Sequence, residues 1–562
     1  MNNDVLQRSI QKCRQTWSMQ AKISFLPRFF SVNPPRLSPM IPKASRFLLF
    51  SCLCSTYMGL YAAQGQSTSA PEWRTSSFDA QRDGWQRDES KLTTSNAKDI
   101  RLLWKVKTDN KSMGMHSFRE PLIIAGVQTA SGVKTLAILA GAANEVYAID
   151  ADSGTMLWQK QLKWASDKPQ TSDINSGFIC SKALSATPVV TPAGAANRFL
   201  YVLGTDGYLH ILDLSTGDEA KPPMQMLPAA YGKPYGLNLK DNVVYTATGQ
   251  GCYGVPNKLY AVDLTNGKAF SSPVRQGGIF GTAGPSIGTD GTIYLETGDG
   301  PYNPATGQLS TTVQAYTSSS DTLTLKDYYT PVNHEWLTIR DLDMDVTPVV
   351  FPYEGRDLLV GSGKEGRYFL MDSKSLGGPN HFDPLYRSPL VSNTNANFQT
   401  EGTWGSLASW KDHDGTRWVL APIGGPVAVP FPITHGATPN GGVIAMKLTD
   451  QSGKMALTPA WLSRDMMTAE PPVVANGVVF VLAAGEFTGQ ANDVDGGLYS
   501  WQERVKRSIP AKLYALDAET GKELYSSGDQ VTSFLHQAGI AVAGGRVIFG
   551  TFDGTIYCFG LP

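Results

Sequence analysis

The chain of 562 residues is long enough to bury a large core, and its low charged fraction of 17% with 12 Trp, 22 Tyr and 22 Phe excludes a largely disordered protein. Its 56 Gly and 35 Pro suit many short strands and tight turns rather than helical bundles. The net charge of −1 is the sum of two unlike parts: residues 1–46 contain eight Lys or Arg and one acid, and the remainder contains 40 basic and 48 acidic residues. Because this remainder is acidic, a nucleic-acid-binding surface of the usual basic kind is excluded.

The first predicted element is an export leader over residues 1–65. Lys43 and Arg46 precede an apolar stretch of about 16 residues, FLLFSCLCSTYMGLYA, and small residues follow it, which is typical of a secretory signal. Met40 would give a leader of ordinary length, so we expect translation to start there. A membrane anchor is the alternative, but a spanning helix usually needs about 20 apolar residues. We therefore predict a periplasmic or secreted mature chain without a transmembrane domain.

The mature part keeps three cysteines, Cys180, Cys252 and Cys558, with no Cys-x-x-Cys spacing. A zinc site is not supported by this pattern. A disulfide between Cys180 and Cys252 is possible in an oxidising compartment, but the sequence leaves the pairing open.

After a lead-in segment at 66–100, one phrase recurs along the chain: NEVYAIDADSGTMLW (144–158), GYLHILDLSTGDE (207–219), NKLYAVDLTNGKAF (257–270), GRYFLMDSKSLGG (366–378) and AKLYALDAETGKEL (511–524). Each copy predicts a strand that ends at an Asp, then a tight turn with Gly, then a further strand. A second strand–turn–strand signal precedes most copies. Three to four strands per unit, repeated at intervals of tens of residues, is how a propeller blade looks in sequence.

The strand-ending positions indicate eight blades, the fourth of them a divergent one around residues 313–329. The last blade lacks its outer strand, and RLLWKVKT (101–108) is available to complete it, which would leave no open sheet edge. We therefore predict an all-β fold over 101–562: an eight-bladed propeller of four-stranded antiparallel blades, closed by an N-terminal strand. Trp104 and Trp158 are expected to pack between blades.

The repeat phrase resembles the propeller repeats associated with pyrroloquinoline quinone (PQQ), and the segment 77–108 is similar to the corresponding one of eight-bladed quinoprotein alcohol dehydrogenases. The resemblance covers about residues 70–562. The same repeat also occurs in non-enzymatic propeller scaffolds, so the resemblance implies the fold more strongly than the chemistry.

Three stretches look like the site of those dehydrogenases. The segment 277–303 resembles their calcium-binding loop, which implies Asp299 as a Ca²⁺ ligand and Phe280 as a cofactor contact. The strand WLTIRDLDMDVTPVV (336–350) matches the one with their catalytic Asp, which implies Asp341 or Asp343 as base and Ca²⁺ ligand. The segment 361–372 implies Lys364 beside the quinone.

The chain also departs from that pattern. The adjacent Cys-Cys pair and the Trp on which the quinone lies are missing from their expected places, and no Glu can be assigned to complete the calcium site. Asp341, Asp343 and Asp345 alternate, so on a strand they would line one face and attract a cation; in the alternative interpretation they lie in a solvated loop. In the alternative interpretation, Asp299 is an ordinary turn residue, and Lys364 is an exposed lysine in a hairpin turn.

Two functions therefore stay open. The first is an exported binding or interaction module, with a protein partner or a small ligand. The second is a PQQ- and Ca²⁺-dependent dehydrogenase that oxidises an alcohol or a sugar. Long loops, among them the Pro- and Gly-rich segment 423–442, are where binding is expected on either hypothesis, because loops on a rigid scaffold usually carry the function.

Overall fold

The computed structural model describes residues 70–165, 179–275, 277–491 and 496–562. The chain divides into two units, Met1–Gly65 and Gln66–Pro562, and all of the described residues belong to the second. The predicted export leader and the predicted start at Met40 lie outside the described residues. The helices of the described parts are all too short or too polar to span a membrane.

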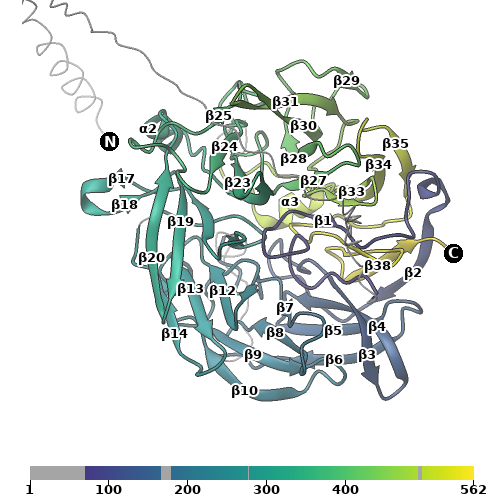
Figure 1. Cartoon of the computed structure of the whole chain (residues 1–562). Coiled ribbons are helices and arrows are strands. Elements are labelled where there is room, and N and C mark those ends of the chain that lie inside the picture. Colours follow the sequence, from purple (N-terminus) through teal and green to yellow (C-terminus); the bar gives the residue numbers. More distant parts are fainter. Residues whose placement is uncertain (1–69, 166–178, 276, 492–495) are drawn as a thin grey trace, which may run out of the picture. The chain divides into compact units, whose positions relative to one another are not determined.

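Eight antiparallel sheets follow one another around a ring, as Figure 1 shows, which confirms the predicted propeller. The strands of blades 1 to 4 are, from the inner to the outer strand, β3 (Leu122–Thr129), β4 (Gly132–Gly141), β5 (Glu145–Asp150) and β6 (Met156–Gln161); β7 (Val189–Val190), β8 (Phe199–Leu203), β9 (Tyr208–Asp213) and β10 (Glu219–Gln225); β11 (Asn238–Lys240), β12 (Val243–Ala247), β13 (Leu259–Asp263) and β14 (Ala269–Ser271); and β15 (Ser286–Ile287), β16 (Ile293–Thr297), β19 (Thr312–Ser319) and β20 (Thr322–Tyr329).

Blades 5 to 8 continue in the same order, and blades 6 and 7 each gain a short fifth strand that pairs in parallel, β29 (Ile433–Thr434) and β1 (Trp85–Gln86). Their remaining strands are β22 (Val349–Tyr353), β23 (Arg356–Gly361), β24 (Phe369–Asp372) and β25 (Tyr386–Arg387); β27 (Ala408–Lys411), β28 (Arg417–Gly424), β30 (Gly441–Gln451) and β31 (Lys454–Leu462); β32 (Val473–Ala475), β33 (Val478–Ala483), β34 (Lys512–Asp517) and β35 (Glu523–Ser526); and β36 (Ala541–Ala543), β37 (Arg546–Gly550), β38 (Thr555–Gly560) and β2 (Arg101–Lys107).

Short elements occupy the connections between these strands. They are β17 (Tyr302–Asn303), β18 (Gln308–Leu309), β21 (Val346–Thr347), β26 (Gly405–Ser406), the helices α2 (His334–Ile339) and α3 (Trp501–Arg507), and three 3₁₀ turns at Ala97–Asp99, Cys252–Gly254 and Pro304–Thr306.

The ring closes as predicted, because β2 from the N-terminal side forms the outer strand of blade 8. It pairs antiparallel with β38, with Lys105 opposite Tyr557 and Val106 opposite Ile556. One blade therefore joins residues about 450 positions apart in the chain, and neither end of the ring presents an unpaired edge at this point.

The Asp and Gly of the repeat form the turn that ends each strand. In blade 2 the amide of Gly217 donates to the carbonyl of Asp213 at 2.9 Å, and the Asp213 carboxylate accepts from the amide of Ser215. Gly217 has a φ of 74°, a conformation that side chains with a β-carbon rarely adopt. The same bond joins Gly154 to Asp150 and Gly521 to Asp517.

Tryptophans dock onto these turn glycines and hold neighbouring blades together. The ring of Trp158 lies so close to Gly217 that a β-carbon there would approach its Cε3 to 2.5 Å, and its indole N–H donates to the carbonyl of Leu214 at 2.9 Å. Trp104 packs in the same way on Gly154, which confirms the predicted packing of both tryptophans. Trp461 repeats the contact on Gly521.

Residues 73–86, here called the plug segment, cross the centre of the ring and bond to the innermost strand of all eight blades. The bonds, in blade order, are Trp73 N to Ile123 O (2.8 Å), Val190 N to Arg74 O (2.9 Å), Asn238 Nδ2 to Ala80 O (2.9 Å), Ile287 N to Ala80 O (2.7 Å), Val350 N to Gln81 O (3.1 Å), Ser409 N to Asp83 O (2.7 Å), Val474 N to Gly84 O (2.8 Å) and Gln86 Nε2 to Val542 O (3.2 Å).

Arg82 anchors the plug segment from within. Its side chain is fully buried and donates to the carbonyls of Ser76 and Leu237, each at 2.7 Å, and to the hydroxyl of Thr75 at 2.8 Å. Burial lowers the pKa of Arg82 to about 10, which still leaves the guanidinium charged at neutral pH. A buried charge of this kind is stable only while its hydrogen bonds are made.

A first prediction concerns the contact between blades. We expect Gly217→Ala to lower the free energy of unfolding by about 2–4 kcal/mol, because the new methyl group meets Trp158 and strains the turn. Gly194→Ala is the matched control: its φ of 83° gives a similar backbone strain, but nothing lies within 4 Å of the added carbon, so about 1 kcal/mol is expected. Denaturant unfolding measures both, and equal losses would contradict the role of the tryptophan.

A second prediction concerns the plug segment. Arg82→Met removes the donors for buried carbonyls of residues 76 and 237 and should lower the free energy of unfolding by about 3 kcal/mol. Arg101→Met, at an exposed position of β2, should change it by less than about 0.5 kcal/mol. A thermal melt of Arg82→Met that matches the unchanged protein would show that the plug segment does not support the ring.

Candidate functional site

A cavity of about 520 Å³ lies where blades 3 to 8 converge at the beginnings of their inner strands. Its lining includes the segments just before β11, β15, β22, β27, β32 and β36 and loops that follow the second strands of several blades. The plug segment bonds further along the same inner strands and contributes no residue to the lining. The cavity is therefore a pocket at one end of the central channel.

One wall of the cavity is acidic and contains the predicted Asp341, Asp343 and Asp345. They lie in an irregular stretch before β21 instead of on a strand, yet all three line the cavity. Asp343 and Asp345 are buried, so the solvated-loop interpretation is wrong for these two, whereas half of the Asp341 side chain stays exposed. Asp299 lines the same cavity from an exposed turn with a φ of 56°.

Lys364 is buried in this wall, and the interpretation as an exposed turn lysine is wrong. Its ammonium donates to Asp343 Oδ2 at 2.6 Å and to the carbonyl of Asp341 at 3.0 Å, and Asp341 Oδ1 lies 3.5 Å away. The turn is covered because Gly402 packs directly on the Lys364 backbone and Asn393 donates to its carbonyl. Sequence spacing does not show such a contact between distant loops.

Burial and the charges of neighbouring groups together shift the pKa values of the side chains in this wall. Burial lowers the pKa of Lys364, but the charges of Asp343, Asp345 and Asp341 outweigh it and raise that pKa. Burial, with the charge of Asp343 and against that of Lys364, raises the pKa of Asp341 to about 6. Burial also raises the pKa of Asp345 well above its usual range, and neither of its carboxylate oxygens has a hydrogen-bond partner among the described residues.

Two aromatic rings line the cavity beside this wall. Phe280, the predicted cofactor contact, lies against Gly249, where a β-carbon would approach its ring to 2.8 Å. Trp404 lies under Lys364, with the ammonium 5.2 Å from the centre of its ring. Sequence reasoning missed Trp404, because it comes from the segment before β27 and not from the stretch around Phe280 where the aromatic residue was expected.

The predicted calcium ligands Asp299, Asp341 and Asp343 share the cavity, but the donor set does not fit Ca²⁺ as it stands. The Lys364 ammonium lies within ion-pair distance of the carboxylates of both Asp343 and Asp341, and a cation there would have to displace it. The described parts of the chain contain no group of three or more His, Cys, Asp or Glu arranged to hold a metal ion. The roles assigned to these three residues stay predictions.

A second polar cluster, which was not predicted, includes Glu486, Arg504 and His536 in the cavity lining and continues to His116 and Arg119 in the segment before β3 of blade 1. Glu486 accepts from Arg504 at 2.7 Å and from Nδ1 of His536 at 2.8 Å. The His536 ring packs edge-on to that of His116 at 4.9 Å, and His116 Nδ1 accepts from Arg119 at 3.1 Å. These residues lie up to about 420 positions apart, so no motif could have indicated them.

The pKa shifts in this cluster have clear causes. Burial lowers the pKa of Lys233 to about 8, with the charges of Arg119 and Arg504 acting in the same direction. Burial, followed by the charge of Glu486, raises the pKa of Glu470 to about 7. Burial raises the pKa of Glu486, but the hydrogen bonds that it accepts from His536 and Arg504, together with the charge of Arg504, outweigh burial and lower that pKa.

A disulfide joins Cys180 and Cys252 at the rim of the cavity, which decides the pairing that the sequence left open. Its neighbour Ile179 lines the cavity. Cys558 is buried in blade 8, and burial raises its pKa to about 12, so it is an inert core residue. The predicted binding loop 423–442 also reaches the cavity, through Ile423–Gly425 at one end and Asn440 at the other.

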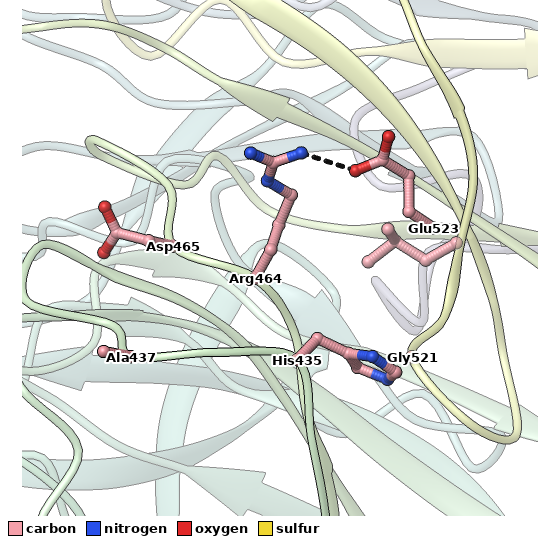
Figure 2. Close-up of a pocket in the computed structure, with 7 residues that line it drawn as sticks. His435, Ala437, Arg464, Asp465, Gly521 and Glu523 are labelled. Carbon is pink, nitrogen blue, oxygen red and sulfur yellow. Dashed lines mark hydrogen bonds and ion pairs between the residues drawn. The ribbon is translucent and has the colours of Figure 1, made fainter.

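A smaller pocket of about 360 Å³ lies between blades 6 and 7, away from the central cavity (Figure 2). Figure 2 shows Arg464 turned toward Glu523. The two side chains pair at 2.6 Å, and Nε2 of His435 lies 2.8 Å from the carbonyl oxygen of Thr520. Because the polar groups of this pocket already have protein partners, the central cavity is the better candidate site.

Comparison with known proteins agrees with this architecture. Residues 61–272 match a family model of PQQ-type repeats described as outer membrane protein assembly factor BamB. No curated protein sequence matches the chain.

Solved structures resemble the chain over most of its length. A quinohemoprotein alcohol dehydrogenase from Pseudomonas putida HK5 is 14% identical with a TM-score of 0.56, and one from Comamonas testosteroni is 15% identical with a TM-score of 0.54; each match covers 87% of this chain and 80% of the other. A europium-containing methanol dehydrogenase is 14% identical with a TM-score of 0.53, over 88% of this chain and 99% of the other. At such identities the likeness shows a shared fold.

A third prediction tests the buried ion pair. Lys364→Met leaves Asp343 buried without its counter-charge and should lower the free energy of unfolding by about 3–5 kcal/mol. Asp343→Asn in the same background removes that charge and should recover most of the loss, because the two residues form one unit. Denaturant unfolding of the two single variants and the double variant measures the coupling, and additive losses would show that the ammonium and the carboxylate are independent.

Proposed function

The chain carries PQQ-type repeats in an eight-bladed β-propeller, and on this basis we propose that it is an exported binding module that holds a small polar molecule in its central cavity. The observation that carries the proposal is the cavity itself. Its volume of about 520 Å³ suits a small ligand, and charged side chains from several blades converge on it with two aromatic rings beside them.

The rigidity of the scaffold supports this function. The plug segment ties all eight inner strands together, so the loops that line the cavity start from fixed positions. A ligand that binds between such loops loses less free energy to ordering the protein than one that binds flexible segments.

Export is part of the proposal. The basic and apolar N-terminal segment supports it, and so does the Cys180–Cys252 disulfide, since disulfides persist in oxidising compartments. The periplasm or the outside of the cell is therefore the proposed location. The match to a family model described as an outer membrane assembly factor makes a protein partner a further possibility for the outer surface of the ring.

The second candidate is a quinoprotein dehydrogenase that acts on an alcohol or a sugar. One observation favours it: Asp341, Asp343, Lys364 and Phe280, assigned to that chemistry through the resemblance, all line one cavity, and Trp404 adds an aromatic ring there. Asp341 would be the better placed base, because Asp343 is engaged by Lys364. The unfavourable donor set for Ca²⁺ places this candidate second.

A fourth prediction separates the two functions. PQQ and CaCl₂ added to the purified protein should give no bound quinone absorbance and no dye reduction with alcohols or sugars, because the Lys364 ammonium already occupies the place beside Asp341 and Asp343 that a Ca²⁺ ion would need. Stoichiometric quinone binding with turnover that Asp341→Ala abolishes would establish the dehydrogenase instead.

Binding itself is measured by thermal melts with a panel of sugars, polyols, amino acids and organic acids. We expect at least one class to raise the melting temperature. Thr400→Trp, at an exposed position of the cavity lining, should abolish the shift by narrowing the cavity, whereas Thr400→Ser should retain it. A panel without any shift would overturn the proposed function.

A further inference from the structure

The part of the cavity wall that comes from blades 3, 7 and 8, here called the basic wall, includes more cations than carboxylates among the described residues. Its cations are Lys233 and Arg504, and Arg119 lies behind the lining, in the segment before β3. The carboxylates described in this wall are those of Glu486 and Glu470. His116 and His536 have pKa values that burial lowers below the usual range, so they add no charge at neutral pH.

The charges in this wall are unevenly paired. Glu486 accepts from Arg504 and from His536 and so is fully used. Glu470 accepts backbone N–H groups, that of Gln537 at 3.1 Å among them, and no cation lies within ion-pair distance of it in the described structure. Arg119 bonds to the neutral His116, and its Nε has no partner among the described residues.

Lys233 lines the cavity without an ion-pair partner among the described residues. It lies just before β11, lines the cavity and is only partly exposed. Within the described ranges no carboxylate lies within 4 Å of its ammonium, and its strongest charged neighbours are the guanidinium groups of Arg119 and Arg504. A cation held beside two other cations in a poorly solvated place is stabilised when an anion binds.

We infer that this wall is an anion subsite, with Lys233 at its centre, that binds the carboxylate of a small organic acid. The inference rests on the proposed function, because the subsite is one side of the same cavity. The ammonium of Lys233 makes the direct contact, while Arg504 and Arg119 supply positive potential from either side.

The surroundings favour a carboxylate over a phosphate. The described residues of this wall already include the carboxylates of Glu486 and Glu470 beside its cations. A ligand carboxylate with one negative charge therefore meets less repulsion there than a phosphate that carries up to two. Tyr235, whose pKa burial raises, keeps its phenol proton and can donate to the anion from the lining.

Asp341, Asp343 and Asp345 line the cavity as well, and Lys364 beside them is already paired with Asp343 and Asp341, so the described residues of this acidic wall offer no open cation to a second anionic group. The rest of the ligand is therefore expected to be neutral and polar, as in a hydroxy acid or a sugar acid, and not a second carboxylate. Gluconate is such a molecule, and gluconamide is its uncharged analogue.

The experiment is calorimetric titration of the full mature protein with sodium gluconate, sodium lactate, inorganic phosphate and gluconamide. We expect an acid to bind, gluconamide to bind at least about tenfold more weakly, and Lys233→Met to weaken binding of the acid by about tenfold or more. Lys233→Arg should keep most of the affinity. Lys240→Met, an exposed lysine on β11 outside the lining, is the matched control and should bind like the unchanged protein.

Each other outcome decides a separate point. Binding of phosphate without binding of either acid would overturn the carboxylate assignment. Equal affinity of Lys233→Met and the unchanged protein would overturn the subsite, and thermal melts of both proteins would show that the variant is folded. If sugars or polyols bind in the cavity and the acids do not, the inference fails while the proposed function stands; if nothing in either panel binds, both fail.

Discussion

The structure depends on one short segment that hydrogen-bonds to the innermost strand of every blade. An inner strand of two or three residues, as in blades 2, 3, 4, 7 and 8, makes few ladder bonds of its own. Residues 73–86 supply the missing partners, and Arg82 fills the buried space between them with donors for backbone carbonyls. Because unpaired backbone groups are costly when buried, the segment and the ring stabilise each other. The tryptophans that dock on the turn glycines then join neighbouring blades further out.

This arrangement explains where the polar chemistry of the protein lies. The plug segment occupies the channel along the inner strands, and the cavity lies at the end where these strands begin. The residues there come from loops whose backbone is held by the blades, which allows charged groups to be buried close together. The Lys364–Asp343 pair on one side and the cluster of Glu486, Arg504 and His536 on the other are both of this kind. Buried charges of this type contribute little net stability, and this supports the proposed binding of a ligand.

Much of the fold could be predicted because the physical cause is local. The alternation of apolar residues, the Asp that accepts backbone amides and the Gly with positive φ are all read within about fifteen residues of chain, and their repetition gives the number of blades. The site was predicted in part. Asp341, Asp343 and Lys364 were implied by a resemblance, but the burial of Lys364 and its contact with Trp404 depend on the connection between blades 5 and 6. The fifth strands of blades 6 and 7 were missed because two-residue strands have no periodicity to detect.

The sequence by itself therefore determined the eight-bladed ring, its closure by residues 101–107 and the packing of Trp104 and Trp158, since each follows from a repeated local pattern. Only the tertiary structure decided the Cys180–Cys252 pairing, the path of the plug segment and the distribution of charge around the cavity. The physical reason is distance along the chain. The charge of Arg504 acts on both Lys233 and Glu486, although about 270 residues separate it from Lys233, and such interactions exist only after the blades have brought their loops together.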